Sequence, residues 1–295
     1  MDGSPPPAGT ADLERRTVTA LVYAVVVLAA LLAPWPVFAT LVAVLAALGY
    51  LELRALFRYR PYQPWLVGLV FVLLFIAAHL YTGGVARPSE LTVWTGLAIV
   101  AFGVVAILVW LLEALRRRPY PAVLGALFTL GGALYLGLGL GFLIDLRLAE
   151  SDGTRGWLGA LPVWLLLALI PTWIGDSVAY LVGARLGSRK IVPRISPGKT
   201  WEGTLAGFVA AAVTALLIAV SAGTQTGPAL LVAALVGPAG FAGDLFESAL
   251  KRAVGAKDSG TLFPGHGGVL DRIDSLIFVA PTVAFALWIA RGAYL

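Results

Sequence analysis

The chain has 295 residues, of which 59% are hydrophobic and only 13% are charged. An average soluble domain is about 45–50% apolar and about 25% charged, so a water-soluble globule of this composition would lack polar surface. A disordered chain is excluded too, because it needs low hydrophobicity and high charge. The absence of cysteine excludes a disulfide framework, a thiolate metal site and a cysteine nucleophile. We therefore expect a polytopic integral membrane protein.

Nine stretches are apolar and long enough to cross a bilayer core of about 30 Å, which takes about 20 residues per helix. They cover residues 17–33, 37–57, 64–82, 91–112, 121–144, 157–183, 201–222, 227–249 and 273–291, with Gly237-Pro238 interrupting the eighth. The sequence thus predicts an all-α fold of about nine transmembrane helices. Residues 1–12 are expected to be a disordered tail, residues 13–160 a transmembrane scaffold and candidate dimerisation region, and residues 161–295 a catalytic transmembrane region.

The lysines and arginines indicate which loops face the cytoplasm. With a cytoplasmic amino terminus, nine spans place 17 of the 21 basic residues in cytoplasmic segments and leave the carboxyl terminus outside. This distribution accounts for the net charge of +5, so we expect no nucleic-acid partner. The expected location is the cell (cytoplasmic) membrane.

The first five predicted spans carry few groups that could do chemistry. His79, near the outer end of its helix, is interpreted as an interfacial residue or one bonded to a backbone carbonyl. Glu52 and Arg54, near the inner face, are interpreted as a pair or as side chains that snorkel to the interface.

Carboxylates at membrane depth set the carboxyl-terminal half apart. Asp176 lies in the sixth span, and Asp244 and Glu247 lie in the eighth. Such residues usually face a water-filled or ion-binding interior, although an intramembrane ion pair is the alternative. Asp244, Glu247, Ser248 and Lys251 recur at helical spacing, which predicts one stripe running to the cytoplasmic surface.

Two loops add phosphate-binding chemistry to these carboxylates. Residues 196–202 contain Gly198-Lys199-Thr200, but Pro193 replaces the glycine of a full phosphate-binding loop and no strand is expected before it. Its amides, lysine and hydroxyls still suit a phosphate. Residues 251–274 combine lysines and arginines with two aspartates three positions apart. Hard oxygen donors without cysteine select Mg²⁺, and basic residues beside such a metal are typical of phosphoryl or nucleotidyl transfer.

Residues 248–274 read S-x-L-K-R-x4-K-D-x-G-x2-F-P-x-H-G-G-V-x-D-R-I-D and resemble, position for position, the signature of the phosphatidate cytidylyltransferase (CDP-diacylglycerol synthase) family. Residues 176–180 and 196–203 also resemble segments of this family. The resemblance covers residues 170–280 by motif, and residues 1–160 only by hydrophobicity and number of spans.

The resemblance implies a membrane enzyme, typically a homodimer, that condenses CTP with phosphatidic acid to CDP-diacylglycerol and pyrophosphate, using Mg²⁺ and with a second cation left open. Asp244 and Asp271 match the positions that hold metal in the family. The expected catalytic residues are Asp244, Asp271, Lys251 and Arg272. The expected substrate-binding residues are Ser196, Lys199, Thr200, Arg252, Lys257 and His266. Carboxylates expected to support the ligands or hold a second cation are Asp176, Glu202, Glu247, Asp258 and Asp274.

Two other functions fit parts of the pattern. A CTP-dependent lipid alcohol kinase would move the γ-phosphoryl group and release CDP, whereas a cytidylyltransferase releases pyrophosphate. A cation-coupled transporter would account for intramembrane Asp176 and Asp244 in broken helices. The charged stripe, however, ends in one cytoplasmic loop, and no acidic or basic relay continues towards the outer face.

Overall fold

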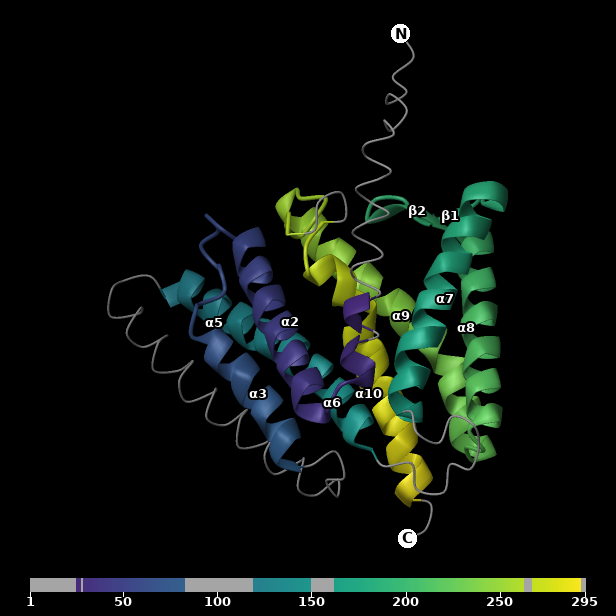
Figure 1. The fold of residues 1–295 in the computed structure, drawn as a ribbon. Coiled ribbons are helices and arrows are strands. Elements are labelled where there is room, and N and C mark those ends of the chain that lie inside the picture. Colours follow the sequence, from purple (N-terminus) through teal and green to yellow (C-terminus); the bar gives the residue numbers. More distant parts are fainter. Residues whose placement is uncertain (1–24, 28, 83–118, 150–161, 263–266, 293–295) are drawn as a thin grey trace.

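The computed structural model describes residues 25–27, 29–82, 119–149, 162–262 and 267–292 (Figure 1). Among them, the helices in the amino-terminal half are α2 (Trp35–Leu56), α3 (Gly68–Thr82), α5 (Pro119–Ala133), the π-helical turn η1 (Leu134–Leu138) and α6 (Gly139–Leu148). The carboxyl-terminal half contains α7 (Val163–Leu186), α8 (Trp201–Ser221), α9 (Thr226–Val254) and α10 (Leu270–Gly292). Strands β1 (Lys190–Val192) and β2 (Ser196–Thr200) form an antiparallel hairpin between α7 and α8.

Within the described residues, six helices are long and apolar enough to cross a membrane, and Gly68–Leu80 is a shorter apolar helix. The chain is therefore a mostly helical, multi-pass membrane protein. These seven helices coincide with seven of the nine stretches predicted from hydropathy. Of the other two, residues 17–33 lie in large part, and residues 91–112 entirely, outside the described residues. The count of nine and the orientation of the termini stay predictions.

Two local expectations were wrong. Gly237-Pro238 does not interrupt the eighth span, since α9 runs through both residues as one helix of 29 residues. A strand does precede Gly198-Lys199-Thr200, because the chain turns back on itself at residues 193–195 and pairs Lys190 with Thr200. The hairpin is antiparallel, so it differs from the strand, loop and helix order of a phosphate-binding loop.

Helix α10 joins the two groups of helices in the bundle. In Figure 1, α7, α8 and α9 pack together on one side, while α2, α3, η1 and α6 pack together on the other. Helix α10 lies between them and contacts α9 and α7 as well as α6 and α2. The β1–β2 hairpin, the carboxyl ends of α2, α7 and α9 and the amino end of α10 all lie at one end of the bundle, at the top of Figure 1.

His79 and Asp145 form a buried polar contact between α3 and α6. Nδ1 of His79 lies 2.6 Å from Oδ2 of Asp145, and only 1% of His79 is exposed. The sequence analysis did not expect this carboxylate partner, and the position of His79 at the membrane interface stays a prediction. A side chain at Gly141 would overlap the imidazole ring, so this glycine leaves the space that the histidine fills.

We expect His79→Leu to lower the free energy of unfolding by about 1–3 kcal/mol, because it leaves the buried Asp145 carboxylate without this partner. The double variant His79→Leu/Asp145→Leu should recover part of that loss, since it removes both polar groups. Denaturation of the detergent-solubilised variants measures both effects. A double variant as unstable as the sum of the two single variants would contradict a coupled pair.

Candidate active site at the end of the bundle

A polar cavity of about 1170 Å³ opens where α7, the β1–β2 hairpin, α9 and α10 meet. Most of the residues that the sequence singled out line it. They are Asp176, Ser196, Lys199, Thr200, Asp244, Lys251, Lys257, Asp258, Asp271, Arg272 and Asp274. Segments separated by almost one hundred residues thus place acidic and basic side chains around one space.

A close approach of α9 to α10 brings the carboxylates of the two helices together. A Cβ atom at Gly243 would collide with the backbone carbonyl of Asp274 and lie 3.0 Å from the Cα atom of Ser275. Only glycine allows the two backbones to come this near without a shift. Asp244, the next residue on α9, therefore faces the same cavity as Asp271 and Asp274 on α10.

Lys199 of β2 pairs with Asp244 of α9. Both side chains are partly accessible, with 19% and 28% of their surface exposed, so a ligand in the cavity can reach them. Ser248, one turn further along α9, lies 3.3 Å from the Asp244 carboxylate through its hydroxyl. The hairpin thus places Lys199, a residue type that often binds phosphate, beside the carboxylate of Asp244.

Lys251 sits between two carboxylates of different helices. Its ammonium group pairs with Glu247 on its own helix and lies 2.5 Å from Oδ1 of Asp271 on α10. Glu247 is fully buried, whereas Lys251 and Asp271 reach the cavity. Within α9, Asp244 thus contacts Ser248 and Glu247 contacts Lys251, as expected for residues that share one face of a helix.

Thr200 and Arg252 position the hairpin. The Thr200 hydroxyl accepts a hydrogen bond from the backbone of Gly203 at 3.2 Å and so caps the amino end of α8. Arg252 of α9 donates to the carbonyl of Ile195 in the hairpin turn and to that of Ala256. Contacts at both ends of β2 therefore fix the strand that carries Lys199.

Three of the described residues that the sequence predicted for the site, Glu202, Glu247 and Arg252, do not line this cavity. Glu202 accepts hydrogen bonds from Ser188 and from the backbone of Arg189, which closes the turn between α7 and β1. Glu247 and Arg252 make the contacts described above, and His266 lies outside the described residues. Their suggested roles towards substrate stay predictions.

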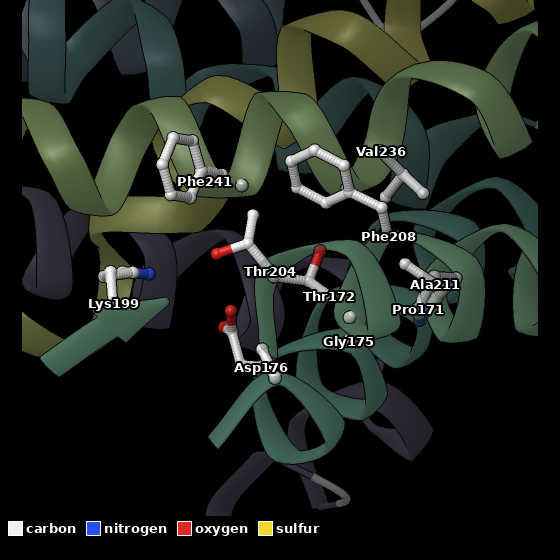
Figure 2. Close-up of a pocket in the computed structure, with 14 residues that line it drawn as sticks. Pro171, Thr172, Gly175, Asp176, Lys199, Thr204, Phe208, Ala211, Val236 and Phe241 are labelled. Carbon is white, nitrogen blue, oxygen red and sulfur yellow. The ribbon is translucent and has the colours of Figure 1, made fainter. Parts of the chain in front are cut away.

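A narrower pocket extends from the cavity between α7, α8 and α9. Figure 2 shows Lys199, Asp176 and Thr204 at its polar end, and Phe208, Ala211 and Val236 at its apolar end. Its volume of about 30 Å³ is small beside that of the cavity. Asp176 thus joins Lys199 at the point where polar surface gives way to apolar packing.

The donor chemistry of the cavity fits a divalent cation, although the described residues contain no group of three or more His, Cys, Asp or Glu side chains that could hold a metal. A magnesium ion in a nucleotide site commonly uses one or two carboxylates and takes its other ligands from phosphates and water. Asp244 and Asp271 supply two such carboxylates, and each already faces a cationic lysine. Enzymes of nucleotidyl transfer generally use divalent cations.

Two residues near the site were missed as functional candidates. Glu52, expected to pair with Arg54 or to snorkel, instead accepts hydrogen bonds from Ser259 and from the backbone at the start of α10. Ser259 in turn donates to Asp271. The only sequence signal was a carboxylate at the membrane edge of α2, and one sequence cannot indicate a partner more than 200 residues away.

The model of the cytidylyltransferase family matches residues 14–290. The phosphatidate cytidylyltransferase of Bacillus subtilis is 31% identical over 283 residues, which cover 94% of this chain and 98% of that protein. The phosphatidate cytidylyltransferase of Thermotoga maritima is 42% identical over 134 residues, 43% of this chain and 50% of that protein. An uncharacterized Escherichia coli protein, YnbB, is 52% identical over 124 residues, 42% of this chain and 41% of that protein. The chain therefore matches about half of the length of the latter two relatives.

We expect Gly243→Ala to separate α9 from α10 and to destabilise the protein by about 1–3 kcal/mol, because the added methyl group has no room beside Asp274. Gly240→Ala, one turn earlier on α9, is the matched control, since its Cβ would make only ordinary contacts of 3.6–3.8 Å. Thermal unfolding in detergent compares the two variants. Equal melting temperatures would show that α9 and α10 do not depend on this contact.

Proposed function

The chain belongs to the cytidylyltransferase family, and we propose that it is a phosphatidate cytidylyltransferase, which condenses CTP with phosphatidic acid to CDP-diacylglycerol and pyrophosphate. The observation that carries this proposal is the cavity at the bundle end, where the carboxylates of Asp244 and Asp271 lie among lysines and an arginine. The family match and the names of the relatives favour this function over a lipid alcohol kinase or a transporter.

The reaction needs two phosphate groups held in line. A phosphate oxygen of phosphatidic acid forms a bond to the α-phosphorus of CTP, and the bond from that phosphorus to the bridging oxygen breaks, which releases pyrophosphate. The attacking phosphomonoester has a second pKa of about 6, so it is largely ionised near neutral pH and needs no strong base. Positioning and charge neutralisation are then the main tasks of the protein.

The residues that we propose to bind phosphate in the cavity form two sets. Lys251, Lys257 and Arg272 come from the end of α9, the following loop and the start of α10, and would hold the triphosphate. Ser196, Lys199 and Thr200 come from the hairpin and would hold the other phosphate. Arg252 would act through the hairpin turn that it contacts.

Mg²⁺ is the cation that we propose for this site, with Asp244 and Asp271 as its protein ligands. When bound, it would neutralise charge on the phosphates during nucleotidyl transfer. Asp176, Asp258 and Asp274 line the same cavity and would support these ligands or hold a second cation.

The proposed setting is the cytoplasmic face of the cell membrane, where CTP is available. The described loops and helix ends at the end of the bundle that carries the cavity contain 12 of the basic residues expected on that side: Arg54, Arg58, Arg60, Arg185, Arg189, Lys190, Arg194, Lys199, Lys251, Arg252, Lys257 and Arg272. We further propose that the protein is a homodimer. Each subunit would have nine spans, a cytoplasmic amino terminus and an outer carboxyl terminus.

Purified protein incubated with radiolabelled CTP, phosphatidic acid and Mg²⁺ should form a lipid that carries labelled CMP, together with one pyrophosphate per lipid. Removal of the metal with EDTA should abolish the product, and added Mg²⁺ should restore it. Release of CDP in place of pyrophosphate would identify a kinase. Solute uptake into vesicles without any requirement for CTP would instead favour a transporter.

Asp271→Asn and Asp244→Asn should each lower the rate of CMP transfer by more than about 100-fold, because each removes a proposed metal ligand. Size-exclusion profiles and helical circular dichroism like those of the unmodified protein would show that the variants are folded at the assay temperature and that the loss is chemical. Near-normal activity in the Asp271→Asn variant would remove the metal assignment.

A further inference from the structure

The carboxylate of Glu52 binds the first turn of α10 from another helix. Its Oε1 atom accepts a hydrogen bond from the backbone of Val269, and its Oε2 atom accepts one from the backbone of Leu270, both at 2.9 Å. These N–H groups stand at the amino end of α10, where no residue of the same helix can accept them. Glu52 is thus a helix cap supplied by α2.

A single residue, Ser259, links the same carboxylate to the proposed metal ligand. Oε2 of Glu52 lies 3.1 Å from the Ser259 hydroxyl, and that hydroxyl lies 2.8 Å from Oδ2 of Asp271. Oδ2 of Asp271 also accepts hydrogen bonds from the backbone of Ser259 at 2.9 Å and of Gly268 at 2.7 Å. Two backbone N–H donors therefore fix one oxygen of Asp271, with the Ser259 hydroxyl as a third when its proton points to Asp271, while the other oxygen faces Lys251.

The Ser259 hydroxyl lies within hydrogen-bond distance of both carboxylates but has a single proton to donate. The proton can go to Glu52 or to Asp271, and the backbone donors of Ser259 and Gly268 hold Asp271 in either case. Glu52 fixes the backbone at residues 269 and 270, and hence the position from which the Asp271 side chain starts. The orientation of Asp271 depends on Glu52 through both routes.

Two glycines leave the space that Glu52 occupies. A Cβ atom at Gly260 would lie 2.6 Å from Oε1 of Glu52, and one at Gly268 would collide with Oε2. The loop between α9 and α10 is therefore shaped around a carboxylate from α2. Such close fitting is hard to reconcile with a glutamate that merely snorkels to the interface.

We propose that Glu52 is a positioning residue for Asp271, which holds the carboxylate of α10 in the orientation that a divalent cation requires. The inference rests on the proposed function, in which Asp271 is a metal ligand. Groups that support a metal ligand in this way typically change metal affinity or activity by about 10–100-fold when they are removed.

The test measures Mn²⁺ binding to the full-length protein in detergent by electron paramagnetic resonance. Glu52→Gln should weaken Mn²⁺ binding about tenfold and raise the Mg²⁺ concentration for half-maximal activity by a similar factor, with little change in the KM for phosphatidic acid. A role in stability alone would reduce the amount of folded protein at every metal concentration and leave the metal affinity unchanged.

Gly260→Ala should reproduce this weaker binding, because its methyl group would overlap the Glu52 carboxylate, to which its three nearest atoms belong or are bonded. Gly131→Ala is the matched control, since its Cβ would meet nothing within 4 Å, and it should bind Mn²⁺ normally. Gly260→Ala also keeps the proposal testable if Glu52→Gln does not fold.

Normal Mn²⁺ affinity in Glu52→Gln and Gly260→Ala, together with weak binding in Asp271→Asn, would overturn the role of Glu52 and leave the proposed function intact. Normal affinity in Asp271→Asn would overturn the metal assignment itself, and the positioning role with it. Weaker binding in all three variants, with Gly131→Ala normal, supports both.

Discussion

A charged side chain inside a membrane bundle has to be neutralised by another protein group, because hydrocarbon solvates no charge. In this chain the partners come from different elements: Lys199 of β2 meets Asp244 of α9, and Lys251 of α9 meets Asp271 of α10. Removing one partner would leave an uncompensated charge, which is strongly destabilising when it is buried. The charges proposed to handle phosphate therefore also hold the hairpin and two helices in place, so the stability of this region and its chemistry depend on the same side chains.

These charged side chains meet where two backbones come close together. Glycine permits this close approach because it has no side chain. Gly243 allows α9 to touch α10 beside the carboxylates. Between α7 and α8, a Cβ atom at Gly207 would come within 2.8 Å of Ala179, and one at Gly203 would come within 2.8 Å of Gly183. Small residues at such contacts let membrane helices pack by van der Waals forces, since lipid offers no hydrophobic gain. The hairpin follows α7 and precedes α8 at the basic end of this tight contact, so the contact determines where Lys199 can reach.

The sequence predicted those features that depend on composition and local spacing. Hydropathy located the described helices, and helical spacing placed Asp244 and Lys251 on one stripe of α9. It missed the hairpin, because Pro193, Pro197 and Gly198 hide the alternation that indicates a strand. It also missed the contacts of His79 with Asp145 and of Glu52 with α10, which join residues 66 and more than 200 positions apart. Periodicity reports which face of a helix is buried, and it carries no information on which distant polar group lies opposite.

The capping of α10 shows why such a distant contact matters. The residue before this helix is Val269, which has no side-chain acceptor for the free N–H groups of the first turn. Glu52 supplies that acceptor, and its own position is set by Gly49, one turn earlier on α2, whose Cβ would lie only 3.1 Å from Leu136 and 3.2 Å from Ile273. The packing of α2 against η1 and α10 thus determines the position of the Glu52 carboxylate that caps α10. Asp271 lies in the turn that is capped. A region expected from sequence to be a scaffold and candidate dimerisation region therefore acts on the proposed site through one carboxylate.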